Sequence, residues 1–240
     1  VNSSKCEPVV MDEQFNSAVT DIFRNEYLSP RSPYTTLQIP KQGIGEWCHP
    51  LHTVDIDDSG LRSSVQKGVL NTKLGVPFRT PAEGQNIAFT SLWDNYPDSL
   101  TVSLKGKASR AYLLMAGSTN HMQCHIDNGL IRVYYKDGTC DKMALRNPDN
   151  WAPIEHIFFE DGLAFNRHAP ALYRLRLKTG EISNNFGEEL GFPGASRELD
   201  GGAAILLEMP LNPDKKLSHL VLETLSNDVV IGLMGITLQR

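Results

Sequence analysis

The sequence predicts a mostly β protein, an antiparallel β-sandwich preceded by a short N-terminal helix and an irregular extension. Three observations support this fold class. From residue 86 onward short apolar segments recur with turn residues between them, one of these turns is the hairpin pair Asp137-Gly138, and almost no segment after residue 27 has helical spacing. Many short strands joined by tight turns are typical of a sandwich or barrel.

The clearest strand patterns lie between residues 86 and 120. Residues 100–104 (Leu-Thr-Val-Ser-Leu) alternate between apolar and polar, the period-2 pattern of a strand with one buried face. Residues 111–116 (Ala-Tyr-Leu-Leu-Met-Ala) are apolar throughout. This second pattern predicts a central strand that is covered on both faces.

The remaining strands follow from the same patterns. Segments 130–135 and 142–145 flank Asp137-Gly138, and such a pair between two strands is the strongest short-range hairpin signal in the chain. The strand expected at 173–177 (Tyr-Arg-Leu-Arg-Leu) should turn both of its arginines outward. The last strands are expected at 203–209, 217–225 and 229–238.

The N-terminal third has a different character. Apolar residues at helical spacing predict an amphipathic helix over 12–27, with Asp12 as its N-cap. The Gly- and Pro-rich stretch at 41–50 is the best candidate for a boundary. We expect residues 1–85 to form an extension packed on a sandwich domain of residues 86–240, because both parts carry apolar residues that need a core.

Composition narrows the classes of partner. The 240-residue chain is 40% hydrophobic and 21% charged, which is ordinary for a globular protein, and its net charge is -5. An acidic surface disfavours nucleic acid and anionic membranes as partners, and no apolar run is long enough to span a bilayer. The sequence starts without Met and without a signal-peptide pattern, so we expect a processed or trimmed piece of a larger protein.

A family resemblance rests on five segments, which are Phe89 to Pro97, Leu104 to Ala108, Ala116 to Asn120, Val133 to Thr139 and Val230 to Leu238. Together they resemble a galactose-binding-like jelly-roll module. Such modules accompany large exported glycoside hydrolases and related proteins of polysaccharide-degrading bacteria. The resemblance covers residues 86–240 and implies an accessory domain, periplasmic or extracellular, that binds carbohydrate or contacts a catalytic domain of the same larger chain. One fold hosts many functions, so no ligand-binding residue is carried over.

Sugar recognition needs aromatic faces for the apolar side of the ring and planar polar groups for its hydroxyls. The predicted turn Trp93-Asp94-Asn95-Tyr96 offers both, and these four residues together with Trp47 are the candidate ligand-binding residues. Trp151 also lies in a turn-like segment. The competing interpretation is that these aromatic side chains pack in the core, as large aromatic residues usually do.

No metal site and no cofactor is predicted. On one strand His121 and His125 would share a face but lie about 13 Å apart, and the Cys and His residues at 48–52 lack the paired motifs of structural zinc. The acidic turn at 55–62 lacks the spacing and the distal Glu of an EF-hand, so a structural calcium ion there has no motif to support it. The four scattered cysteines are expected to be buried free thiols, or to form one bridge if the protein is exported.

Catalysis has only weak candidates, namely the neighbouring pairs Asp57-Asp58, Glu155-His156 and Glu160-Asp161. Neighbours on a strand point to opposite faces, and no nucleophile-elbow motif is present. No catalytic residue is therefore assigned. Three functions stay open: a non-catalytic sugar-binding module of a carbohydrate-processing protein, a structural domain that supports a glycoside hydrolase domain without binding sugar, and an independent small hydrolase or lyase.

Overall fold

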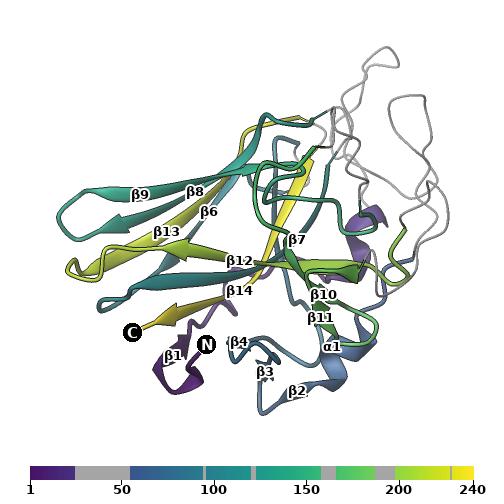
Figure 1. The fold of residues 1–240 in the computed structure, drawn as a ribbon, viewed down its shortest axis with the longest axis horizontal. Helices are drawn as coiled ribbons and strands as arrows, with labels where there is room; N and C mark the ends of the chain where they lie inside the picture. Colours follow the sequence, from purple (N-terminus) through teal and green to yellow (C-terminus); the bar gives the residue numbers. More distant parts are fainter. Residues whose placement is uncertain (25–54, 94–95, 120–122, 158–165, 187–197, 228) are drawn as a thin grey trace.

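A computed structural model describes residues 1–24, 55–93, 96–119, 123–157, 166–186, 198–227 and 229–240. Strands make up 47% of the structure and helices 8%. Every pair of named strands is antiparallel. The predicted fold class, a mostly β protein built as an antiparallel sandwich, is confirmed (Figure 1).

The larger of the two facing sheets has seven strands. Its order is β1-β14-β7-β12-β10-β11, and β5 pairs with β14 as well. The bounds are β1 (Cys6–Pro8), β5 (Ala88–Ser91), β7 (Arg110–Thr119), β10 (Tyr173–Arg176), β11 (Ile182–Ser183), β12 (Ala203–Pro210) and β14 (Val229–Gln239). The long strands β7 and β14 lie side by side in the middle of this sheet.

The smaller sheet has the order β6-β13-β8-β9. Its strands are β6 (Ser99–Ser103), β8 (Asp127–Tyr135), β9 (Cys140–Arg146) and β13 (Leu217–Thr224). The β8–β9 hairpin turns at Asp137-Gly138 as expected, and Gly138 has a φ of +85°, which L side chains rarely adopt. A separate sheet of three short strands, β2 (Val65–Gln66), β3 (Val69–Asn71) and β4 (Pro77–Arg79), belongs to the N-terminal part.

Strand β7 separates two hydrophobic clusters. Leu113 and Met115 contribute to the cluster that also holds Ile131 of β8 and Leu220 of β13, so this cluster fills the space between the two large sheets. Leu114 contributes to the second cluster, together with residues of the N-terminal part. The prediction that residues 111–116 form a central strand covered on both faces is therefore confirmed.

The N-terminal part supplies the cover for the outer face of the seven-stranded sheet. Its described residues include two 3₁₀ helices, η1 (Ser3–Lys5) and η2 (Val19–Arg24), and one short α-helix, α1 (Ser59–Ser63). Buried side chains from this part, including Ile22, Leu61 and Phe78, share the second cluster with β7 and β14. In Figure 1 the three-stranded sheet and α1 accordingly lie next to the larger sheet.

The helix expected over 12–27 is shorter than predicted, because only η2 at Val19–Arg24 is helical within the described residues. The preceding residues are used differently. The Asn16 side chain accepts from Phe89 N–H and donates to Phe89 C=O, and Ser17 forms a β-bridge with Ile87. These bonds to a part of the chain about 70 residues away fix Asn16 and Ser17 outside any helix, although the apolar spacing alone indicates one.

The prediction that both arginines of the 173–177 strand face outward is wrong for Arg174. Its side chain is only 4% exposed, whereas Tyr173 is 39% exposed. The guanidinium donates to the carbonyl oxygens of residues 153, 156 and 203 at 2.8–2.9 Å, because the chain at 153–156 covers this side of β10. Burial lowers the pKa of Arg174 to about 10, and the charge of the nearby Glu155 opposes that shift.

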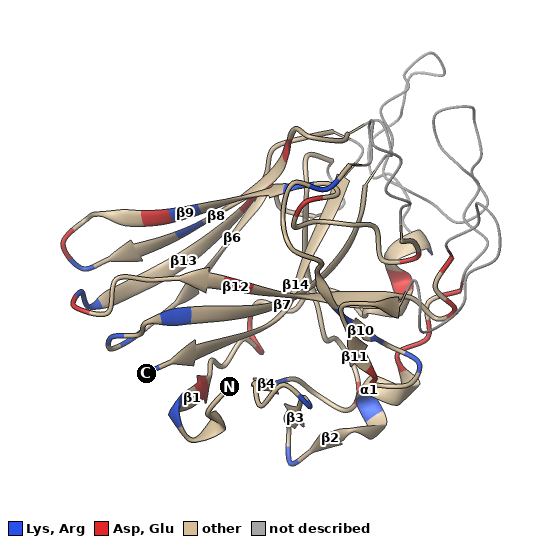
Figure 2. Ribbon diagram, in the orientation of Figure 1, with Lys and Arg blue, Asp and Glu red and all other residues tan. Residues whose placement is uncertain are grey.

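Charged side chains of the described residues are concentrated in turns and at the ends of hairpins, while β14 carries none (Figure 2). Three of the four cysteines, Cys6, Cys124 and Cys140, are free thiols, and Cys48 lies outside the described ranges. Among the helices described, none has the length and apolar content needed to cross a membrane.

Candidate functional site

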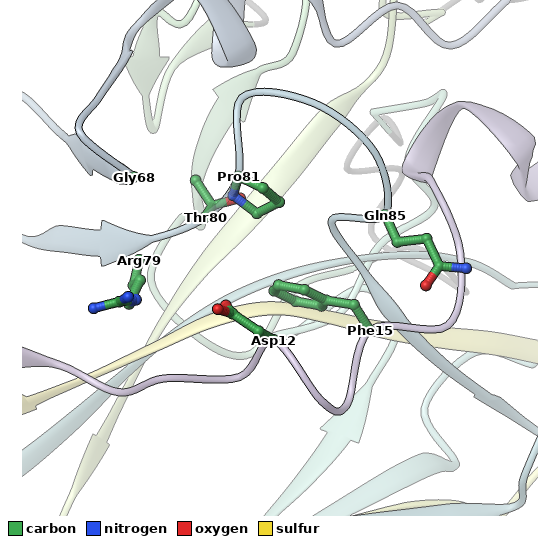
Figure 3. A pocket seen from close by; sticks show the side chains of 7 residues that line it. All are labelled: Asp12, Phe15, Gly68, Arg79, Thr80, Pro81 and Gln85. Carbon is green, nitrogen blue, oxygen red and sulfur yellow. The ribbon is translucent and has the colours of Figure 1, made fainter.

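A pocket of about 250 Å³ opens between the N-terminal segment and the three-stranded sheet (Figure 3). It is lined by residues from three stretches of the chain, which are Asp12, Phe15, Gly68, Arg79, Thr80, Pro81 and Gln85. The Phe15 ring and the Pro81 ring face one another, Asp12 and Arg79 lie toward one end, and Gln85 lies toward the other (Figure 3). The pocket thus combines apolar walls with polar groups at both ends.

One wall of the pocket is fixed by pairing with β5. The Asn16 side chain bonds both backbone groups of Phe89, with an Nδ2–O distance of 3.0 Å and an N–Oδ1 distance of 2.9 Å. Ser17 adds backbone bonds to Ile87 and Asn86. These contacts hold the segment that carries Asp12 and Phe15 against a buried strand of the larger sheet.

The opposite wall is the loop 80–85, and it is fixed by a buried polar network. Asp58 Oδ2 accepts from Arg62 Nε at 2.8 Å and from Asn86 Nδ2 at 2.9 Å. Arg62 also donates to the carbonyl oxygen of Gly84 at 2.7 Å, and Asn86 accepts from Val19 N–H. Asp58 therefore serves to anchor this loop.

Gly68 belongs to the tight turn between β2 and β3. Lys67 and Gly68 have φ values of +52° and +78°, and two central residues with positive φ are what a type I′ hairpin turn requires. Thr80 N–H donates to Gly68 C=O at 3.1 Å. The turn and the start of the loop therefore support one another at this edge of the pocket.

The polar groups at the pocket are available to a ligand. Within the part of the chain that the structure describes, Asp12, Arg79 and Gln85 are exposed and form neither an ion pair nor a side-chain hydrogen bond. Thr80 is only 1% exposed, and its hydroxyl oxygen has no hydrogen-bond partner among the described residues. A buried hydroxyl without a partner is uncommon, because burying it costs about 1–3 kcal/mol. The pocket thus offers a carboxylate, a guanidinium and an amide beside two apolar rings, whereas the Thr80 hydroxyl oxygen is itself fully buried.

The residues predicted as ligand-binding lie elsewhere. Trp93 and Tyr96 are half-buried and pack against the second hydrophobic cluster, where the Tyr96 ring lies 5.2 Å from that of Phe89. Burial raises the pKa of Tyr96, while a hydrogen bond with Ser17 opposes this shift. Asp94, Asn95 and Trp47 lie outside the described residues.

Trp151, which the sequence placed in a turn-like segment, is completely buried between the two large sheets. The carboxylates considered for catalysis lie in separate parts of the structure. Asp58 is part of the network that anchors the pocket loop, and Glu155 is buried beside Arg174. Glu160 and Asp161 lie outside the described ranges.

A second group of polar side chains consists of His125, Asp149 and His168. Each offers one potential metal-ligand atom, and these atoms all lie within 4.8 Å of one another. The sequence alone groups His125 with Cys124 and His121, and His121 lies outside the described residues. Asp149 and His168 are separated from His125 by β8, β9 and a long connection, so no local motif connects them.

Comparison of the chain with protein-family models, with curated proteins and with solved structures gives no match. Function is therefore inferred from the residues and their geometry.

Proposed function

We propose that the chain is a non-catalytic, sugar-binding accessory module of a carbohydrate-processing protein, and that the pocket at Asp12, Phe15, Arg79 and Gln85 holds the sugar. The observation that supports this is the combination of an apolar ring face with planar polar groups that have no other partner within the described residues. A pyranose ring is complementary to such a pocket, because it has an apolar face and a rim of hydroxyl groups. Carboxylate and guanidinium groups form the stronger hydrogen bonds to such hydroxyls.

The size of the pocket agrees with a small ligand. Small-molecule sites have volumes from roughly 300 Å³ upward, and a pocket of about 250 Å³ suits a single sugar ring better than a long chain. Its two walls are anchored on β5 and on the Asp58 network before any ligand binds. A site that is already ordered loses less conformational entropy on binding.

The experiment is a calorimetric titration of the chain with a panel of monosaccharides and short oligosaccharides that includes galactose. Arg79→Gln and Asp12→Asn should each weaken the binding of a sugar that the wild-type chain binds. A hydrogen bond to a charged group is worth about 1.5–3 kcal/mol, so the expected loss is about 10- to 100-fold in affinity.

The matched controls are Arg24→Gln and Asp214→Asn, which make the same chemical changes at exposed positions away from the pocket. Both should bind as the wild type does. Trp93→Ala should also retain binding when its fold is intact, because Trp93 packs on the second cluster rather than at the pocket. Absence of binding across the panel, or equal binding by the pocket variants and their controls, contradicts the proposal.

The structural alternative, a domain that supports a catalytic domain without binding sugar, is favoured by one observation. Ile126 and Leu225 are 47% and 39% exposed. Both bond Asn128: its side-chain amide donates to Ile126 C=O, and its backbone carbonyl accepts from Leu225 N–H. Two exposed aliphatic residues whose backbone groups bond the same residue are a small candidate contact surface. Hydrogen exchange of this chain alone and within a longer protein that contains it tests the alternative: protection around residues 126 and 225 in the longer protein supports it, and unchanged exchange contradicts it.

A further inference from the structure

The group formed by His125, Asp149 and His168 is built from three loops near one end of the four-stranded sheet. His125 lies just before β8, Asp149 follows β9, and His168 precedes β10. The two imidazole rings lie side by side, with their centroids 4.9 Å apart and their planes tilted by 33°. Both rings contact the carboxylate of Asp149.

The orientation of Asp149 is set by the backbone. Its Oδ1 atom accepts a hydrogen bond from the His168 N–H at 2.6 Å, which leaves Oδ2 directed at the two histidines. Metal-binding carboxylates are commonly fixed by such a second hydrogen bond. Asp149 is therefore held in place by one oxygen while the other is presented to both rings.

The distances around Oδ2 do not suit hydrogen bonds. His125 Nδ1 lies 3.8 Å and His168 Nδ1 lies 3.9 Å from Oδ2, both beyond hydrogen-bond range. Two ligands of one tetrahedral zinc ion lie about 3.3 Å apart, given metal–ligand distances of about 2.0–2.1 Å. The three atoms are thus slightly too far apart to bind one another directly, and small side-chain rotations bring them to the spacing that one cation imposes.

His125 itself carries two further signs of a functional role. Its φ is +54°, an uncommon value for a residue with a side chain, and its N–H donates to the carbonyl oxygen of Asn147 at 2.8 Å. Its Nε2 atom is buried and has no hydrogen-bond partner among the described residues. Unusual backbone conformations concentrate at functional sites, and an unsatisfied buried nitrogen calls for a physical explanation.

We propose that His125, Asp149 and His168 form a binding site for a divalent transition metal of the zinc type. Two imidazoles and one carboxylate suit Zn²⁺ and its first-row neighbours, whereas Ca²⁺ and Mg²⁺ prefer ligand sets made of oxygen atoms alone. Three protein ligands leave at least one coordination position for water or a small ligand, and the exposed His168 gives that position access to solvent. The site shares no residue with the sugar pocket, so each proposal stands or fails separately.

The test is a titration of chelator-treated protein with metal. Calorimetry monitors the binding of Zn²⁺, and visible absorption bands monitor the binding of Co²⁺. The wild type should bind one ion per chain. Asp149→Asn and His168→Gln should each weaken Zn²⁺ binding by more than about 10-fold, since even residues that only orient a ligand change affinity by about 10- to 100-fold. His125→Asn, which retains a residue type that tolerates positive φ, should do the same.

His168→Gln is the most direct variant, because His168 is exposed and its replacement leaves the core unchanged. His219→Gln is the matched control: that histidine stacks on Tyr134 on the four-stranded sheet and should not affect binding. The proposal is overturned if no saturable binding occurs, or if His168→Gln and His219→Gln bind Zn²⁺ equally. Loss of binding in Cys124→Ser together with full binding in His168→Gln overturns the assigned ligand set as well.

Discussion

The indole ring of Trp151 lies directly over Gly117 of β7. A Cβ atom added at Gly117 would come within 2.6 Å of Trp151 Cζ2, and closer still to the carbonyl oxygen of Val230 on the neighbouring strand. Trp151 is fully buried between the two large sheets. The packing of Trp151 against β7 thus depends on the absence of a side chain at position 117.

Gly117→Ala is therefore expected to lower the free energy of unfolding by about 1–3 kcal/mol, the usual cost of overpacking a filled core. Urea denaturation at neutral pH measures the change. Ser118→Ala is the control on the same strand, because the Ser118 hydroxyl is buried without a partner in the described structure and its loss should cost little. Equal stability of Gly117→Ala and the wild type would show that both Trp151 and the Val230 backbone on β14 move aside easily.

Arg174→Met is expected to cost about 3–5 kcal/mol of stability, because it removes the charge beside the buried Glu155 and three hydrogen bonds to carbonyl oxygens. Adding Glu155→Gln should recover part of the loss, since it replaces the buried carboxylate by a neutral amide. A double-mutant cycle in urea measures this coupling.

The control for Arg174 is Arg110→Met. Arg110 pairs with Glu208 between β7 and β12, and about half of each side chain is exposed, so its loss should cost at most about 1 kcal/mol. If Arg174→Met and Arg110→Met cost the same, burial does not make Arg174 important for stability.

Tyr135 should make the stability depend on pH in the alkaline range. Burial is the main cause that raises the pKa of Tyr135 from 10 to about 12. The hydrogen bond that the Tyr135 hydroxyl donates to Asp141 adds to this shift. Between these values the folded protein retains a proton that the unfolded chain releases. The stabilisation by Tyr135 is thus complete below about pH 10 and is lost as the pH rises through about 12.

The comparison variant is Tyr135→Phe, which also deprives the Asn212 N–H of its acceptor. Near pH 8 the wild type should be more stable by about 1–3 kcal/mol, and this difference should shrink steadily above about pH 10. Tyr96 and Tyr112 are present in both proteins, so their own titrations cancel. A difference in urea midpoint that stays constant up to about pH 12 would contradict the assigned shift.

Trp93→Ala should affect stability more than ligand binding. The side chain is half-buried against the second hydrophobic cluster, so its removal is expected to cost about 2 kcal/mol, less than the loss of a fully buried tryptophan. The neighbouring Leu92 is 42% exposed, and Leu92→Ala should cost much less. Thermal unfolding of the two variants gives the comparison, and equal losses would mean that Trp93 contributes no more packing than a surface leucine.

Local sequence patterns were sufficient for much of the fold. The alternation at 100–104, the apolar run at 111–116 and the Asp137-Gly138 turn each specify a structure that depends on adjacent residues only. The exceptions are instructive. Apolar spacing at 12–27 indicates a helix, but Asn16 bonds Phe89 of β5 and Ser17 pairs with Ile87, so the start of this segment is not helical. Arg174 was expected outside because nothing nearby in the sequence shows that residues 153–156 cover it.

Local sequence patterns do not predict the candidate sites either, because each site combines residues that are distant in the sequence. Asp12, Arg79 and Gln85 line one pocket only because β4 and the Asp58 network bring distant segments together. His125, Asp149 and His168 come from three separate loops. The predicted turn makes Trp93 and Tyr96 candidate ligand-binding residues, yet both pack against the second hydrophobic cluster, as aromatic side chains of that size usually do.

Strand β14 pairs with β1, β5 and β7, and these partners occur much earlier in the sequence. A ribosome would expose all three of them before it produced the strand that joins them. Until then the long apolar edge of β7 would be open to pairing with other nascent chains, a known route to aggregation. Rapid folding is not expected from so many distant pairings, and efficient production of the protein should therefore depend on chaperones that shield β7 until residue 239 has emerged.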